Sequence, residues 1–211
     1  MRPYISVDLE TTGVDLEKSE ILEIGAVYDD GVSAIESLEK LEFIIQLDVI
    51  THAEPYAVNM NARLFKAMAR KEGTSLAIAF NAITDLFCKG ATAAAEWDMA
   101  NKFNPRNKIY IAGKNAASFD IPILKSFLKR REYPNTKVLF DSIHYQVLDV
   151  GSMYYAEFGG RIPSLSEISA RAGRAEVTHK ALDDAMDVVY ATRAKMKDSR
   201  WATLGDRLNG N

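Results

Sequence analysis

Cysteine is almost missing from this chain of 211 residues: Cys88 is the only one, which excludes a disulfide within the chain. Long apolar runs are missing as well, because no stretch reaches the ~18 consecutive apolar residues that a membrane-spanning helix needs. The sequence also passes from Met1 into an acidic strand without an apolar leader segment. We therefore expect a protein of the reducing cytoplasm that is neither secreted nor held in a membrane.

An excess of one charge is missing too. The chain has 26 Lys and Arg residues against 29 Asp and Glu residues, a net charge of -3. Its hydrophobic share of 47% is enough for one well-packed core. We expect a single domain over residues 1–211, without internal repeats.

Two carboxylates interrupt the first apolar segment. Residues 4–10 form an apolar, partly β-branched run that ends before Gly13, which predicts a strand. Asp8 and Glu10 are two residues apart, so they share one face of that strand. Neighbouring like charges beside a core repel each other and lose hydration, and a divalent cation between them would offset both costs. An edge strand with a solvated acidic face is the alternative.

The remaining pattern alternates strands and helices and indicates an α/β protein. Further strands are expected over 20–29, 41–47, 109–112 and 138–140, and helices over 62–70, 76–90, 118–131, 142–155, 164–173 and 181–196. Short turns join the first three strands, which predicts an antiparallel meander. Residues 91–107 are expected to form an inserted loop or short helix, and residues 198–211 a flexible tail.

Two further acidic positions follow later in the chain. Asp120 stands at the start of a predicted helix, where an acid is also favoured by the helix dipole alone. His179 precedes the last predicted helix, whose first turn contains Asp183 and Asp184. Each of these positions, taken alone, has an ordinary structural explanation.

Three segments together carry a family resemblance: VDLETTG at residues 7–13, NAASFD at 115–120 and HKALDDA at 179–185. In this order and spacing they resemble the DEDD superfamily of 3′-to-5′ exonucleases, in its histidine-containing DnaQ-like branch (DEDDh). The resemblance implies a ribonuclease H-like fold with a five-stranded mixed sheet flanked by helices. It also implies four metal ligands and a general base; these are Asp8, Glu10, Asp120 and Asp184 as ligands, and His179 as the base.

Spacing within the motifs refines these assignments. The family's third-motif aspartate follows its histidine by five positions, which selects Asp184 over its neighbour Asp183. In the second motif three residues separate Asn115 from Phe119, where many members have two. That spacing is similar to oligoribonuclease and some phage-type relatives, so the subfamily stays open.

The implied cofactors are two Mg²⁺ ions, for which Mn²⁺ could substitute, because an all-carboxylate site suits hard divalent cations. Two such ions can serve both ends of an in-line displacement at phosphorus. Histidine suits the base because an imidazole titrates near neutral pH. For the other two histidines, His52 and His144, we expect structural roles.

Residues beside the motifs are candidates for binding substrate. The resemblance implies that Thr11, Thr12 and Gly13 contact the terminal nucleotide, and that Asn59 contacts a sugar. The remaining candidates are Asn115 from the second motif and, as base-stacking residues or pocket walls, Phe65 and Phe119, for which burial in the core is the alternative. Two basic clusters could follow phosphates, although a solvated helix face explains any one member; they are Lys125, Lys129, Arg130, Arg131 and Lys137, and Lys102, Arg106, Lys108 and Lys114.

Together these features predict metal-dependent release of nucleoside 5′-monophosphates from the 3′ ends of single-stranded nucleic acid. The weak net charge favours short or single-stranded substrates over duplex, and DNA is the preferred substrate. Two alternatives stay open: a 3′-5′ exoribonuclease similar to RNase T or oligoribonuclease, and a nucleic-acid-binding or proofreading module that depends on a polymerase. The expected partners are DNA or RNA 3′ ends, with a homodimer and a polymerase or replication partner left open.

Overall fold

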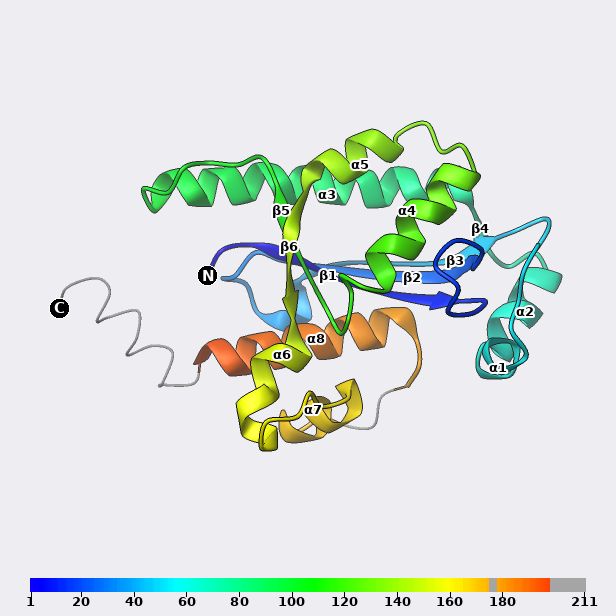
Figure 1. Cartoon of the computed structure of the whole chain (residues 1–211). Helices are drawn as coiled ribbons and strands as arrows, with labels where there is room; N and C mark the ends of the chain where they lie inside the picture. The colour runs from blue at the N-terminus through cyan, green and yellow to red at the C-terminus, as the bar shows by residue number, and fades with distance from the viewer. Residues whose placement is uncertain (175–177, 198–211) are drawn as a thin grey trace.

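The fold is a six-stranded mixed sheet with helices on both faces, and the computed structural model describes residues 1–174 and 178–197 (Figure 1). The strand order is β4-β3-β2-β1-β5-β6. The strands are β1 Tyr4–Thr11, β2 Ile21–Asp29, β3 Glu39–Gln46, β4 Thr74–Ser75, β5 Ile109–Gly113 and β6 Ile143–Asp149. This confirms the predicted α/β class. The sheet has six strands where five were predicted, and the two-residue β4 is among them.

Strand directions divide the sheet into two halves. The first three strands form the antiparallel meander that the short turns predicted, with Asp8 of β1 opposite Gly25 of β2. On the other side of β1, strands β5 and β6 run parallel to it. The chain reaches them through helices, as parallel strands require.

Helices cover the two faces of the sheet separately (Figure 1). One face carries α3 Leu76–Ala100, α4 Asp120–Arg130 and α5 Thr136–Ser142, and the other carries α6 Val150–Tyr154, α7 Leu165–Arg171 and α8 Ala181–Lys197. The helices α1 Pro55–Met60 and α2 Ala62–Ala69 follow β3 at one end of the sheet, and two short 3-10 turns lie at η1 Ile35–Ser37 and η2 Tyr155–Phe158. A capping box formed by Ser164 and Glu167 begins α7.

Alternation along β1 decides which face receives the acidic residues. Ile5, Val7 and Leu9 belong to the larger apolar core, which also contains the buried side chains of α3 and α4. Tyr4 instead packs with the apolar residues of α8, and the Ser6 hydroxyl donates to the carbonyl of Ala185 in α8 at 2.8 Å. Because side chains alternate along a strand, Asp8 and Glu10 lie on the α8 face.

Helix α8 begins directly on top of β2. A Cβ atom added at Gly25 would lie 2.3 Å from both the carbonyl carbon of Ala181 and the nitrogen of Leu182, which are backbone atoms of the first turn of α8. Only a glycine permits this approach. The missing side chain at Gly25 therefore sets how near α8 comes to the strand that carries Asp8.

Three predictions about residues 91–155 were wrong. Residues 91–107 were expected to form an inserted loop or short helix, but α3 continues to Ala100 and the loop covers only residues 101–107. Its alanines are strong helix formers, and Ala91 and Ala94 are buried in the core.

Among the described residues, no helix combines the length and apolar composition needed to cross a membrane.

The other two errors concern a single boundary. Residues 138–140 lie in the helix α5, and the last strand is β6, which falls within residues 142–155, where a helix was predicted. Parallel pairing of Ile143 with Ile109 places the strand here, which local propensity does not reveal. The predicted tail over 198–211 lies outside the described residues.

Gly25→Ala tests the contact between α8 and β2. The added methyl group meets backbone atoms that cannot move aside, so we expect a loss of about 1 to 3 kcal/mol in the free energy of unfolding, measured by urea denaturation. Gly90→Ala in α3 is the matched control, because its Cβ would meet only side-chain ends of Ile5 and Ile109 at 3.2 Å or more. Equal stability of the two variants would contradict the close approach of α8.

Candidate active site

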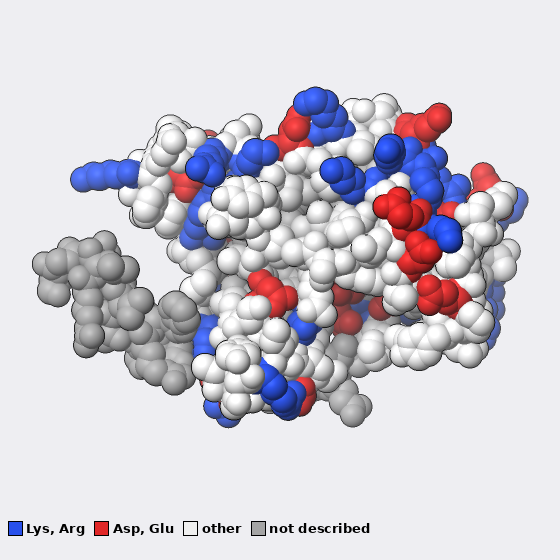
Figure 2. All heavy atoms as spheres, viewed as in Figure 1, with Lys and Arg blue, Asp and Glu red and all other residues white. Residues whose placement is uncertain are grey.

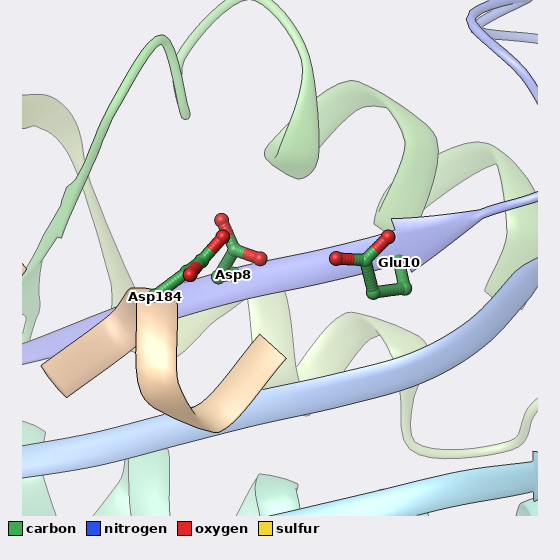
Figure 3. A group of neighbouring side chains, drawn as sticks. All are labelled: Asp8, Glu10 and Asp184. Atoms are coloured by element: carbon green, nitrogen blue, oxygen red, sulfur yellow. The ribbon is translucent and has the colours of Figure 1, made fainter. Parts of the chain in front are cut away.

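Three carboxylates from two elements converge on the α8 face of the sheet. Asp8 and Glu10 extend from β1 and Asp184 from the first turn of α8, and one oxygen of each lies within 4.8 Å of the others (Figure 3). Figure 3 shows the carboxylates of Asp8 and Asp184 next to each other, with Glu10 farther along the strand. Within residues 1–174 and 178–197, the buried Oδ1 of Asp184 has no hydrogen-bond partner. An unpartnered buried oxygen among three acids is a favourable position for a cation.

Burial and mutual repulsion raise the pKa of every acid in this cluster. Burial is the largest cause for Asp8, whose pKa is raised well above its usual value, and the neighbouring charges of Asp120 and Asp184 add to it. Burial also raises the pKa of Asp184 and of Glu10 to about 7. Such a cluster requires either protons or metal ions to offset its charge.

Asp120 stands beside this cluster at the start of α4. Its Oδ1 accepts a hydrogen bond from the backbone N–H of Leu9 at 3.1 Å, which ties α4 to β1. Burial raises its pKa to about 7, and its charge is close enough to raise the pKa of Asp8. The structure thus brings Asp120 next to the three carboxylates, although it is not part of the group that meets within 4.8 Å.

His179 lines the same cavity as the three acids, a pocket with a volume of about 230 Å³. Its backbone has a φ of 52°, in the left-handed region, and its side chain is exposed. Asp183 faces elsewhere: its Oδ2 accepts a hydrogen bond from the Thr178 hydroxyl at 2.7 Å. The structure therefore places Asp184, and not Asp183, among the strand acids.

An ion pair between Glu23 and Arg63 holds the start of α8 in place. Oε2 of the buried Glu23 accepts a hydrogen bond from the N–H of Ala181 at 3.0 Å, and its carboxylate binds the guanidinium of Arg63 through two hydrogen bonds. Glu23 stands opposite Glu10 in the register of β1 and β2. Glu23 was not among the predicted site residues, although it is an acid within an apolar strand.

Among the predicted substrate-binding residues of the first motif, Thr11 and Gly13 line the pocket and Thr12 does not. The Thr11 hydroxyl donates to the carbonyl of Gly13 at 2.7 Å. The Thr12 hydroxyl instead accepts from the N–H of Glu20 at 2.8 Å and is fully buried. Thr12 thus fixes the loop between β1 and β2.

The other predicted contacts divide in the same way. Phe119 lines the pocket, whereas Phe65 lines a separate cavity beside β3. Asn59 is exposed outside the pocket, and Asn61 lies inside it, because α1 ends at Met60 and the chain turns inward. The side chain of Asn61 donates to the carbonyl of Thr11 at 3.1 Å and lowers the pKa of Glu10 through a hydrogen bond.

Asn115 is exposed in the loop after β5 and does not line the pocket. Its backbone N–H donates to Asp149 at 2.7 Å, and its side-chain oxygen accepts from Lys114. With a φ of 62°, it forms a left-handed turn toward the start of α4. This residue thus holds the shape of the second motif at a distance from the acids.

The predicted basic clusters are partly used inside the fold. Arg130 and Arg131 bind the buried carboxylate of Glu20, which ties α4 to the loop before β2. Lys108 donates to the carbonyls of Asp141 and Ile143. On the side of the molecule that Figure 2 shows, basic side chains gather at two places, over α4 and α5 and near the end of α3. Members of both clusters thus have structural partners.

Comparisons with known proteins relate this geometry to solved structures. No family model matches the chain, and no curated protein matches it in sequence. The chain is similar to E. coli exonuclease I in its zinc-bound complex with single-stranded DNA, with a TM-score of 0.65 and 18% identity over 98% of this chain and 42% of that one. It is also similar to a 3′-exonuclease that recognises the 3′ end of histone mRNA stem-loop, with a TM-score of 0.58 and 12% identity over 93% of this chain and 82% of that one.

The chain has the ribonuclease H-like fold of these exonucleases. This confirms the fold that the resemblance implied. The chain spans less than half the length of exonuclease I, including its complex with a dT13 oligonucleotide, of which 43% is covered.

The raised pKa values predict an unusual dependence of stability on pH. Asp184 titrates near 3.8 when unfolded and near 7 when folded, so the folded metal-free protein holds more protons between these values. Its contribution to stability is present below pH 4 and is lost as pH rises through about 7. In chelator at pH 8, Asp184→Asn should therefore be more stable than wild type by roughly 1 kcal/mol or more, and the difference should vanish near pH 4.

Urea denaturation between pH 4 and pH 8 measures this difference. Asp183→Asn is the matched control, which should gain less stability at pH 8 than Asp184→Asn, because the charge of Asp183 is a lesser cause of the raised pKa of Asp184. Magnesium should raise the stability of wild type at pH 8 and stabilise Asp184→Asn less. An Asp184→Asn variant that is less stable than wild type at pH 8 in chelator would rule out repulsion within the cluster.

Proposed function

We propose that this chain is a metal-dependent 3′-5′ exonuclease of the histidine-containing DEDD type that acts on single-stranded nucleic acid. The observation that carries the proposal is the convergence of Asp8, Glu10 and Asp184 within 4.8 Å, with a buried oxygen of Asp184 left unpartnered. His179 in the same pocket supplies a group that can accept a proton. The similarity to exonuclease I supports the same conclusion at the level of the fold.

The carboxylates fit two divalent cations, for which we propose Mg²⁺. Asp8, Glu10 and Asp184 would hold one ion between them, and Asp8 with Asp120 would hold the second. When bound, such ions stabilise charge at a phosphodiester and lower the pKa of bound water. Burial of the site would strengthen cation binding, because little water competes with the cation for the carboxylates.

The remaining pocket residues position the substrate and move a proton. His179 would take the proton of the attacking water, from an exposed position beside the acids. Phe119 would form a wall against the terminal nucleotide, and the backbone from Thr11 to Gly13 would contact it. Asn61 would favour the ionised form of Glu10 and orient its carboxylate through a hydrogen bond, which offsets part of the pKa rise caused by burial.

We propose single-stranded DNA as the substrate, as bound by exonuclease I, with RNA as the alternative that the histone mRNA 3′-exonuclease suggests. The test uses 5′-labelled DNA and RNA oligonucleotides of one sequence with magnesium, and follows the ladder of products. Shortening from the 3′ end with release of nucleoside 5′-monophosphates supports the proposal. Binding without shortening of either strand would favour a module that depends on a polymerase.

Isosteric variants separate the cluster from its surroundings. Asp8→Asn, Glu10→Gln and Asp184→Asn should each lower turnover by at least about 10²-fold, the scale on which removal of one charge-stabilising group acts. Asp183→Asn should stay near wild type, because its side chain is bound to Thr178. Product ladders at saturating magnesium measure these rates. Equal losses in Asp183→Asn and Asp184→Asn would reject the assigned cluster.

His179→Ala tests the role of the base. If His179 accepts a proton, its loss should lower the rate by about 10² to 10⁴-fold, while the magnesium concentration for half-maximal activity stays unchanged. Full recovery of His179→Ala at high magnesium would show that His179 acts through metal binding instead.

A further inference from the structure

A second cleft lies away from the acidic pocket, where β5 and β6 begin. It has a volume of about 440 Å³ and is lined by the end of α3, the loop after it and the first residues of β5 and β6. Tyr110 of β5 stands opposite Tyr4 of β1, and Asp8 lies four residues farther along β1. At about 3.3 Å per residue, that step alone separates the backbones by roughly 13 Å.

Two stacked ring pairs flank this cleft, and each has an open outer ring. Trp97 and Phe103 lie 5.8 Å apart with nearly parallel planes, and His144 and Tyr145 lie 4.6 Å apart. Phe103 is 59% exposed and Tyr145 is 80% exposed, so each pair offers an aromatic face to solvent. A planar ligand could extend either stack, as bases do on single-strand-binding proteins.

Two hydrogen-bond donors meet inside the cleft without an acceptor between them. The N–H of Gln146 donates to Nδ1 of the buried His144 at 3.1 Å, so the proton of the neutral ring is on Nε2. That Nε2 lies 3.4 Å from Nη1 of Arg106, which can only donate. Within residues 1–174 and 178–197, these two nitrogens have no other hydrogen-bond partner. An anionic oxygen would satisfy both donors.

The surrounding charges favour an anion as well. Arg2 is held against Asp98, with Nε at 2.8 Å and Nη2 at 3.0 Å from its carboxylate oxygens, and stacks over the ring of Tyr110. Asp98 therefore balances Arg2, and its Oδ2 also accepts from the backbone N–H of Arg106 at 3.4 Å. The guanidinium of the exposed Arg106 has no ion pair within residues 1–174 and 178–197. Burial and the nearby charges of Arg106 and Arg2 lower the pKa of His144, which keeps its ring neutral.

We propose that this cleft binds a segment of single-stranded nucleic acid, with a phosphate on Arg106 and His144 and bases stacked on Phe103 and Tyr145. The choice of nucleic acid as the ligand rests on the proposed function. An acidic peptide would satisfy the donors but would leave two exposed aromatic faces without planar partners. A nucleotide unit supplies both an anionic oxygen and a flat ring.

Fluorescence of Trp97 gives a direct readout of this cleft. Trp201 is the only other tryptophan in the sequence, so full-length Trp201→Phe protein reports from Trp97 alone. Titration with oligo(dT) in chelator, which prevents turnover, should quench this fluorescence to saturation. Phe103→Ala and Tyr145→Ala should each weaken binding by about five- to tenfold, and melting curves should show unchanged folding because both side chains are exposed.

Three further variants test whether binding depends on the charge of Arg106 and on residues of this cleft in particular. Arg106→Ala should weaken binding and lower the slope of log affinity against log salt by ~0.7. Tyr155→Ala, a half-exposed tyrosine outside the cleft, and Arg70→Ala, an exposed arginine beside α2, should bind as tightly as the parent protein. Quenching that is absent, or that is unchanged in Phe103→Ala, Tyr145→Ala and Arg106→Ala, would overturn the proposal.

Hydrolysis of a dinucleotide with magnesium separates this proposal from the proposed function, because so short a substrate tests the acidic pocket alone. Hydrolysis without oligo(dT) quenching would overturn the cleft and leave the exonuclease in place. Quenching without hydrolysis would overturn the proposed exonuclease activity and leave the binding of nucleic acid in the cleft in place. Phe103→Ala and Tyr145→Ala should hydrolyse the dinucleotide at the parent rate, and a matching loss there would also overturn the proposal.

Discussion

The candidate site depends on one close approach, the seating of the first turn of α8 against β2 at Gly25. This contact brings Asp184 to within reach of Asp8 and Glu10, which stand on the adjacent strand. Glu23 reinforces it by binding the N–H of Ala181. The protein thus gathers acids that repel one another, and tight packing of backbone against backbone holds them together.

Burial and mutual repulsion of the acids lower the stability of the folded protein, and the same burial suits the acids to binding a cation. Burial keeps the acids poorly hydrated, which raises their pKa values and leaves them ready for a cation. Asp120 approaches from the opposite side through its hydrogen bond to Leu9. Two helices on different faces therefore meet at the same strand, and each brings one acid to it.

Much of this architecture could be predicted from local sequence signals. The period-two pattern of β1 predicted that Asp8 and Glu10 share a face. The choice of Asp184 came from the family resemblance, whose third motif has the aspartate five residues after the histidine. The boundary of β6 could not be predicted, because its place depends on pairing with β5 and not on its own composition. The role of Glu23 and the inward turn of Asn61 were missed for the same reason: each depends on a contact with a distant segment.

The length of α3 has a consequence for how the two ends of the molecule are related. The helix runs without interruption from Leu76 to Ala100, so its last two turns keep a fixed angular phase with respect to its first. Each residue turns a helix by about 100°. Loss of one alanine among Ala93, Ala94 and Ala95 would therefore turn Trp97 and Asp98 around the helix axis, away from Arg2. The acidic pocket would keep its geometry, so a change in the length of this one helix would alter the aromatic cleft alone.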